Sequence, residues 1–274
     1  MSAAVARGTH RLTDAAPWIF DDPFALVLVG PGWEDYAAES MARARLPVVR
    51  QGQAGLLVRS RFPEDRLTEG AFAQYVILGA GLDSFAWRRP DLMGPLTLFE
   101  VDHPATQTWK RERVASLGLP VHERHVFAPL DFEQHTLEDG LRATTFDWGR
   151  PTLFAWMGTT MYLTPAAIES TLRTIAKCGA GSEVALSYNV TWEFVDEMGR
   201  EFLGGVMPGA ERAGEPILTS FAPNEMQALL EPCGLDVVDH PTPNELYTRY
   251  CSGRTDDLRP YTLERLLAAR VVAR

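Results

Sequence analysis

The stretch that decides the fold is Gln74-Tyr75-Val76-Ile77-Leu78-Gly79-Ala80-Gly81-Leu82-Asp83-Ser84. The uninterrupted apolar and aromatic run within it indicates a strand that is buried on both faces of a parallel sheet. Gly79 and Gly81 then end the run, and glycine tolerates unusual backbone angles and lets a ligand approach the main chain. A strand that ends in such a turn and continues as a helix is typical of the nucleotide-binding position in an open α/β sheet.

The glycine pattern is compatible with two classes of cofactor. A dinucleotide fingerprint has a third glycine three residues after the second, for close helix–strand packing and for the approach of the pyrophosphate. Ser84 occupies that position, so the fingerprint fails at its last glycine. S-adenosylmethionine has no phosphate and does not need that approach. The motif therefore favours a methyltransferase over a nicotinamide-dependent dehydrogenase, and a purely structural turn remains a third interpretation.

Length and composition narrow the class of protein. A chain of 274 residues with 46% hydrophobic and 23% charged residues suits one large α/β domain. We find no run of roughly 18 apolar residues that would cross a membrane, and no apolar signal region in Met1–His10. Three cysteines, Cys178, Cys233 and Cys251, are far apart and lack metal-type spacing. We therefore expect a cytoplasmic protein with reduced thiols and no bound metal.

The charge of the chain bears on its partners. The formal net charge is -10 and the pI is near 5.1, which argues against nucleic acid, because phosphate backbones are bound by clustered Lys and Arg. The Arg-rich patches, Arg59/Arg61 and Arg111/Arg113, are short. We expect a small-molecule or peptide substrate and neither a nucleic-acid nor a membrane partner. The oligomeric state cannot be read from the sequence.

The order of hydrophobic patterns predicts the architecture. Residues before about 70 predict helices, and from Tyr75 strands and helices alternate, as in α/β folds. Strands are expected within residues 75–78, 96–102, 121–128, 151–157, 183–188, 235–239 and 263–272. The prediction is a Rossmann-like, open, mostly parallel seven-stranded sheet with helices on both faces. One domain over residues 1–274 would comprise a helical cap (about 1–70), a cofactor-binding core (about 71–190), a lid-like insertion (about 191–220) and a C-terminal part of the sheet (about 221–274).

Acidic residues end two of the predicted strands. A carboxylate at the end of the second strand can accept hydrogen bonds from both ribose hydroxyls, and Glu100 and Asp102 follow Gly79 at about the expected 20 residues. Their spacing puts them on the same side of a strand, with Asp102 nearer the edge where ligands bind. A solvated strand end or a helix cap is the alternative. Asp131 after the third strand is by itself a plain turn residue.

Seven motifs along the chain share the pattern of one family. They are Phe20–Ala25, Val58–Phe62, Val76–Asp83, Phe99–Pro104, Pro129–Phe132, Thr160–Leu163 and Arg249–Arg254. With them the chain resembles the leucine carboxyl methyltransferase-like family of class I S-adenosylmethionine-dependent O-methyltransferases. Its bacterial branch includes enzymes of natural-product biosynthesis. The resemblance implies O-methylation of a small-molecule carboxylate or hydroxyl, with a polyketide-type metabolite as one candidate.

The resemblance also implies roles for individual residues. Arg59, helped by Arg61, would pair with the methionine carboxylate, and Arg11 would be a second basic contact. An exposed helix face is the alternative for Arg59 and Arg61. The other implied cofactor contacts are Gly79 and Gly81 at the methionine portion, Asp102 at the ribose, and Asp131 with Phe132 at the adenine.

Two features leave the activity open. Many members of the family have a glutamate after the fourth strand, where this chain has Met157, which is not a strong hydrogen-bond acceptor. Weaker cofactor binding, or a binding protein without activity, is therefore an alternative. Methyl transfer depends mainly on positioning, and an ionised carboxylate acceptor needs no general base, whereas a phenol would benefit from one. His103 is the one suggestively placed histidine, but a lone histidine is more often structural, so we assign no catalytic residue.

Overall fold

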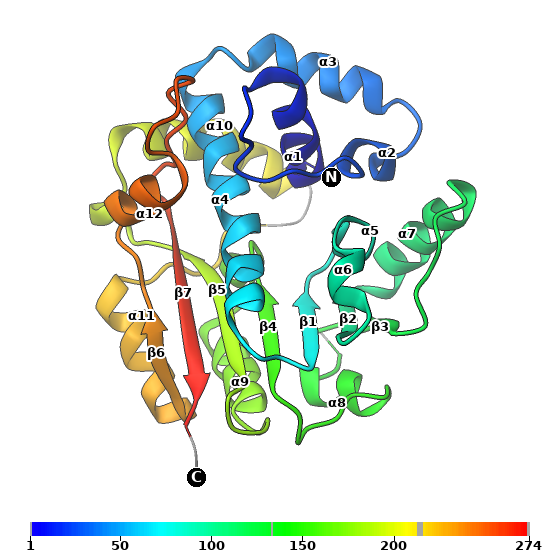
Figure 1. Cartoon of the computed structure of the whole chain (residues 1–274). Coiled ribbons are helices and arrows are strands. Elements are labelled where there is room, and N and C mark those ends of the chain that lie inside the picture. The colour runs from blue at the N-terminus through cyan, green and yellow to red at the C-terminus, as the bar shows by residue number, and fades with distance from the viewer. Residues whose placement is uncertain (1, 133, 213–215, 273–274) are drawn as a thin grey trace.

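The computed structural model describes residues 2–132, 134–212 and 216–272, and a seven-stranded sheet lies at its centre (Figure 1). The strand order is β3-β2-β1-β4-β5-β7-β6. Strand bounds are β1 (Gln74–Leu78), β2 (Thr97–Asp102), β3 (His125–Pro129), β4 (Thr152–Trp156), β5 (Glu183–Asn189), β6 (Leu235–Asp239) and β7 (Glu264–Val271). β7 pairs antiparallel with β5 and β6, and the other neighbouring strands are parallel. The predicted open, mostly parallel seven-stranded sheet is confirmed.

The strand order creates a ligand-binding position beside β1. The chain enters the sheet at β1, an interior strand, and proceeds outward through β2 to β3. It then returns to β4 on the other side of β1. Ligands of open α/β sheets bind outside the carboxyl ends of the strands at such a reversal. In Figure 1 the arrowheads of β1 and β4 point toward the N-terminal helices, and β7 runs the opposite way.

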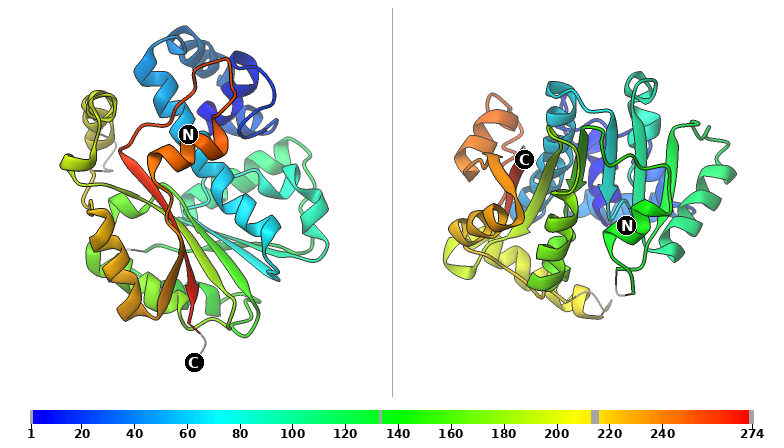
Figure 2. Two further views of the ribbon diagram at one scale, coloured as in Figure 1. Left: turned by 60° about the vertical axis from the view of Figure 1, so that its left-hand side comes forward. Right: turned by 90° about the horizontal axis from the view of Figure 1, so that it is seen from below.

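Helices cover both faces of the sheet, as Figure 2 shows. Val76 and Leu78 of β1 pack in one hydrophobic cluster, and the alternate residues Tyr75 and Ile77 pack in another. The first cluster includes residues of α8 (Leu137–Arg142), α9 (Pro165–Ile175) and α11 (Pro223–Leu230). The second includes residues of α4 (Pro47–Glu69), α5 (Phe85–Arg88), α7 (Pro104–Ser116) and α12 (Pro243–Tyr250). This two-sided burial explains why β1 has no polar face. Shorter helical elements are α6 (Pro90–Met93), η1 (Thr160–Tyr162) and η3 (Glu231–Cys233).

The segment before β1 is helical, as predicted. It comprises α1 (Ser2–Thr13), α2 (Ala25–Val29), α3 (Trp33–Arg43) and α4, which extends from this cap along one face of the sheet (Figure 1). Phe20 and Leu28 of the cap belong to the same buried cluster as Leu57 and Val58 of α4. The cap is therefore packed continuously with the sheet through α4.

The segment after β5, predicted as a lid-like insertion, contains η2 (Trp192–Phe194) and α10 (Glu197–Arg212). α10 contacts α4 on the side of the cap. Residues 213–215 of the predicted insertion lie outside the described residues. Within the described ranges, none of the helices combines the length and the apolar character that are needed to cross a membrane. Cys178, Cys233 and Cys251 are all buried with unpaired thiols.

Candidate functional site

A cavity of about 910 Å³ lies at the carboxyl edge of the sheet, under the cap. Its walls come from α1, α3 and α4, from the turn after β1, from residues 157–162 after β4, from α10 and from the start of β7. The volume falls in the range of about 300–1,000 Å³ that small-molecule and cofactor sites occupy. The cavity also lies at the reversal of strand order beside β1, where an open α/β sheet places its ligand.

The turn after β1 forms one wall of the cavity. Gly79 and Gly81 have φ angles of 70° and 49°, in the left-handed region that favours glycine. The turn is fixed by N–H groups of Gly79 and Ala80, which donate to the carbonyl of Val101 at 2.9 and 3.2 Å. A Cβ atom on Gly79 would overlap with the Cγ2 methyl of Thr159. Glycine at position 79 is therefore required both by the backbone angle and by the approach of Thr159.

Asp102 ends β2 beside this turn and lines the cavity. Its carboxylate accepts hydrogen bonds from the N–H of Gly81 and, at 2.6 Å, from the N–H of His103. Burial raises the pKa of Asp102 above its usual value, although both N–H donors oppose the shift. The structure thus joins the predicted glycine turn to the predicted carboxylate. A role at a ribose remains a prediction.

Arg59 of α4 also lines the cavity. Its Nη1 donates to both carboxylate oxygens of Glu264, at 3.0 and 3.1 Å. Burial lowers the pKa of Arg59, but the carboxylate of Glu264 outweighs burial, so the pKa is raised and the guanidinium stays charged. A Cβ atom on Gly158 would lie 2.7 Å from Cζ of Arg59, so glycine there leaves room for the guanidinium.

Arg7 of α1 also lines the cavity, and sequence reasoning missed it. Its Nε donates to the buried carboxylate of Asp22 at 2.9 Å, and its Nη2 donates to the carbonyl of Leu82 at 2.8 Å. Burial raises the pKa of Asp22, but the charges of Arg7 and Arg88 outweigh it and lower the pKa. Arg7 therefore ties the cap to the glycine turn. No motif marks Arg7 in the sequence, and its need follows only from the burial of Asp22, because a buried carboxylate requires a cation.

Two predicted arginines do not line the cavity. Arg11 lies 3.3 Å from a carboxylate oxygen of Asp21 and stacks over the ring of Trp18. It is one helical turn beyond Arg7 on α1, and that turn carries it away from the site. Arg61 pairs with Asp65 on an exposed part of α4. Residues two apart on a helix do not share a face, so Arg59 and Arg61 cannot both point inward.

Glu100 requires a correction, because the structure does not place it in the cavity. Its side chain is fully buried and pairs with Lys110 of α7 and, at 3.0 Å, with Nε2 of His125. Burial raises the pKa of Glu100, but Lys110 and His125 more than compensate and lower it. Glu100 lies inside β2, under α7, whereas Asp102 lies where the strand ends. Sharing a side of the strand therefore does not give both residues access to the ligand edge.

Asp131 and Phe132 follow β3 and are half-buried, and they do not line the cavity. The carboxylate of Asp131 accepts a hydrogen bond from the side chain of Gln134 at 2.7 Å, and Phe132 packs against a hydrophobic cluster. The N–H of Leu130 donates to the carbonyl of Asp102 at 2.8 Å, which holds this loop beside the end of β2. Their predicted contact with adenine stays a prediction.

Met157 and His103 are the other two residues that the sequence singles out. Met157 lines the cavity and packs against the cluster under α4. His103 is exposed and caps α7, with Nδ1 accepting the N–H of Ala105 at 3.2 Å. Among the described residues that line the cavity, none is a histidine or a cysteine. The buried hydroxyl of Thr159 has no hydrogen-bond partner, so the cavity wall beside Gly79 has an unused polar atom.

Comparisons with known proteins agree with this geometry. A family model described as leucine carboxyl methyltransferase matches residues 1–176. A Bacillus subtilis protein provisionally named S-adenosyl-L-methionine-dependent methyltransferase YktD is 32% identical over 189 residues, 69% of this chain and 62% of that protein. A similarly named Frankia alni protein is 34% identical over 186 residues, 65% of this chain and 59% of its own length. The chain thus spans about three fifths of the length of these relatives.

Solved structures support the fold. A protein of the DUF574 family from Streptomyces avermitilis gives a TM-score of 0.61 at 15% identity, covering 97% of this chain and 96% of that one. A provisionally assigned methyltransferase from Thermobifida fusca gives the same score and identity, covering 97% of this chain and 98% of that one. At such low identity the likeness establishes the fold alone.

Proposed function

The chain belongs to the leucine carboxyl methyltransferase family, and from this premise we propose that it is an S-adenosylmethionine-dependent O-methyltransferase. The proposed acceptor is a small molecule that carries a carboxylate or a hydroxyl. One observation carries the proposal: the glycine turn, Asp102 and Arg59 converge on a single cavity. These are the groups that an adenosyl cofactor with an amino-acid portion needs, namely a close backbone approach, a hydroxyl acceptor and a carboxylate partner.

The residues of the cavity fit S-adenosyl-L-methionine better than a dinucleotide. Arg59 would hold the carboxylate of the methionine portion, and Asp102 would accept the ribose hydroxyls. Ser84, at the third-glycine position of a dinucleotide fingerprint, is buried, and its hydroxyl accepts a hydrogen bond from Nε of Arg88 at 2.9 Å. The third-glycine position thus carries a side chain with its own internal partner, whereas the dinucleotide fingerprint keeps this position free of a side chain for close helix–strand packing.

Part of the cavity has an apolar and aromatic lining, and we assign the acceptor to this part. Its residues include Tyr162, Phe202, Leu203, Ile217, Tyr261 and Leu263. When bound, the cofactor supplies an activated methyl group, and the protein positions the acceptor and excludes water. The described lining contains no histidine, the most common general base, although acidic residues such as Glu39 and Asp83 also line the cavity. We therefore propose first an acceptor that is already ionised and needs no base. A carboxylate on an apolar body fits this requirement.

Methyl transfer to a matched panel tests the proposal. The protein is incubated with S-adenosylmethionine and apolar carboxylates, phenols and amines of similar size, and mass spectrometry detects the methylated product. We expect methyl esters, with less product from phenols. Methylation of amines alone would overturn the O-methyltransferase assignment. Cofactor binding without any product would indicate a binding protein, and thermal stabilisation by NAD(P) alone would indicate an oxidoreductase.

Arg59→Lys is expected to weaken binding of S-adenosylhomocysteine by about 10-fold, because lysine keeps the charge but loses the forked geometry that grips a carboxylate. Isothermal titration calorimetry measures the affinity. Arg61→Lys is the matched control, since Arg61 is on the same helix but points away, and its affinity should equal that of the wild type. Unchanged binding by Arg59→Lys would remove the carboxylate role of this residue.

A further inference from the structure

Glu264 is an acidic residue of the cavity, and its position depends on β7, the strand that runs antiparallel to both of its neighbours. It is the first residue of β7 and lies opposite Asn189, the last residue of β5. Because β7 runs against its neighbours, its start meets the edge where the parallel strands end. A carboxylate from the C-terminal part of the chain is thereby placed at the ligand-binding edge, where it lines the cavity.

Glu264 and Arg59 form a buried pair of opposite charges. Their side chains are only 5% and 16% exposed. Nη1 of Arg59 contacts both oxygens of Glu264, yet each carboxylate oxygen has two lone pairs, so Glu264 keeps capacity for a second donor. Arg59 likewise has donors besides Nη1. A buried pair is stabilising only when further hydrogen bonds satisfy such groups, which suggests a polar ligand beside it.

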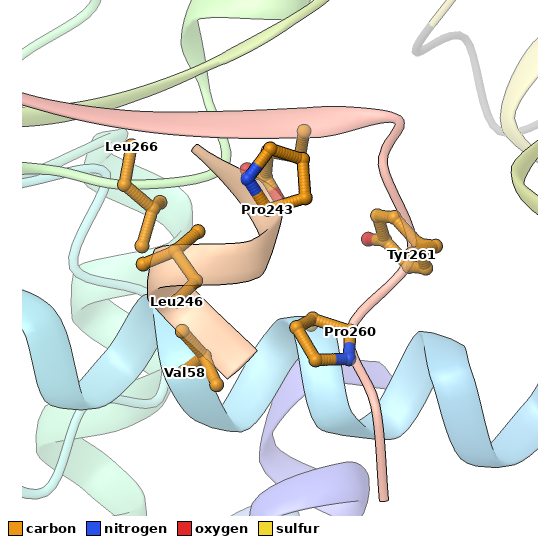
Figure 3. A pocket seen from close by; sticks show the side chains of 8 residues that line it. Val58, Pro243, Leu246, Pro260, Tyr261 and Leu266 are labelled. Atoms are coloured by element: carbon orange, nitrogen blue, oxygen red, sulfur yellow. The ribbon is translucent and has the colours of Figure 1, made fainter. Parts of the chain in front are cut away.

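The other side of Glu264 cannot hold that ligand. It borders a second cavity of only about 10 Å³, which has room for about one water molecule. Figure 3 shows its mainly apolar lining, with Val58 of α4, Leu246 of α12 and Leu266 of β7 around it. A charged partner for Glu264 must therefore come from the large cavity.

We infer that Arg59 and Glu264 together form a clamp for the amino-acid end of the ligand, with Arg59 binding the α-carboxylate and Glu264 binding the α-ammonium group. This inference rests on the proposed function and names the subsite for the methionine portion of the cofactor. In an α-amino acid one carbon separates the two charges, and the pair presents the two complementary charges side by side. Each protein charge meets an opposite ligand charge, so no charge is left buried and unpaired. Met157, which also lines the cavity, offers the ammonium only a weak thioether acceptor, whereas Glu264 offers a charged one.

The test compares two ligands with two proteins by isothermal titration calorimetry. The ligands are S-adenosylhomocysteine and its analogue that lacks only the α-amino group. We expect Glu264→Gln to weaken binding of S-adenosylhomocysteine by about 10-fold, because a charge-assisted hydrogen bond is lost. Binding of the desamino analogue should be the same in both proteins. Glu264→Asp, which keeps the charge on a shorter side chain, should give an intermediate preference and serves if the first variant does not fold.

Glu183→Gln is the matched control. Glu183 is a buried acid on β5 that pairs with Arg66 of α4 and Arg270 of β7, outside the cavity, so its variant should keep the wild-type preference between the two ligands. Equal losses for both ligands in Glu264→Gln, or no loss for either, would overturn the clamp and leave a structural ion pair. If the wild type binds neither S-adenosylhomocysteine nor S-adenosylmethionine, the proposed function itself fails, and the clamp with it.

Discussion

Asp102→Asn is expected to weaken S-adenosylhomocysteine binding by about 100-fold. A carboxylate that accepts both ribose hydroxyls makes two charge-assisted hydrogen bonds, each worth roughly 1.5–3 kcal/mol. The amide loses the charge and one acceptor, and its NH₂ group would face an N–H donor of Gly81 or His103. The ligand contact and the turn that presents it are therefore both weakened. Calorimetry gives the affinity, and thermal denaturation shows whether the protein remains folded.

The matched control is Asp91→Asn. Asp91 pairs with Arg89 at the surface, where its side chain is 59% exposed, and it lies outside the cavity. An exposed pair of this kind contributes little to stability, so affinity and stability should both stay at wild-type values. If Asp102→Asn bound the ligand as tightly as the wild type, the carboxylate at the end of β2 would have no role at the ribose.

The central part of the site could be predicted because its signals are local in the sequence. The buried run from Tyr75 to Leu78 marks β1, the two glycines mark its turn, and Asp102 follows at the spacing of one βαβ unit. Each of these signals lies within about thirty residues. The alternation of residues along a strand, however, reveals only the face on which a residue lies. It does not reveal how far the residue lies from the carboxyl edge where the ligand binds. The sequence pattern therefore groups Glu100 with Asp102, although Lys110 and His125 hold Glu100 below the carboxyl edge of the sheet.

The rest of the site could not be predicted because tertiary packing creates it. Arg7 reaches the glycine turn through an ion pair with Asp22, and no motif marks that arginine in the sequence. Glu264 reaches Arg59 across 205 residues of chain, because an antiparallel strand starts where its parallel neighbours end. A search for acids at the carboxyl ends of strands excludes an acid at the beginning of one. The same limit applies to α10, whose position against α4 depends on packing.

Gly79→Ala is expected to lower the free energy of unfolding by about 2–4 kcal/mol and to weaken cofactor binding by more than about 100-fold. The left-handed conformation costs an L-residue roughly 1–2 kcal/mol. The added methyl group would also overlap with Cγ2 of Thr159, so the turn or the segment after β4 must shift. Either movement changes the wall that the methionine portion would contact. Urea denaturation measures stability, and calorimetry measures affinity.

Two further variants separate the backbone angle from the close approach. Gly81 has a φ angle of 49°, and a Cβ atom added there would meet no atom nearer than 4.0 Å. Gly81→Ala should therefore lose only the free energy of unfolding that the left-handed backbone angle costs. Adding Thr159→Ser to Gly79→Ala removes the overlapping methyl group and leaves Cβ of residue 159, at 3.6 Å, in ordinary contact. We expect the double variant to recover stability to about the level of Gly81→Ala. If it recovered nothing, the left-handed angle alone would explain why glycine is needed at position 79, and the approach of Thr159 would be irrelevant.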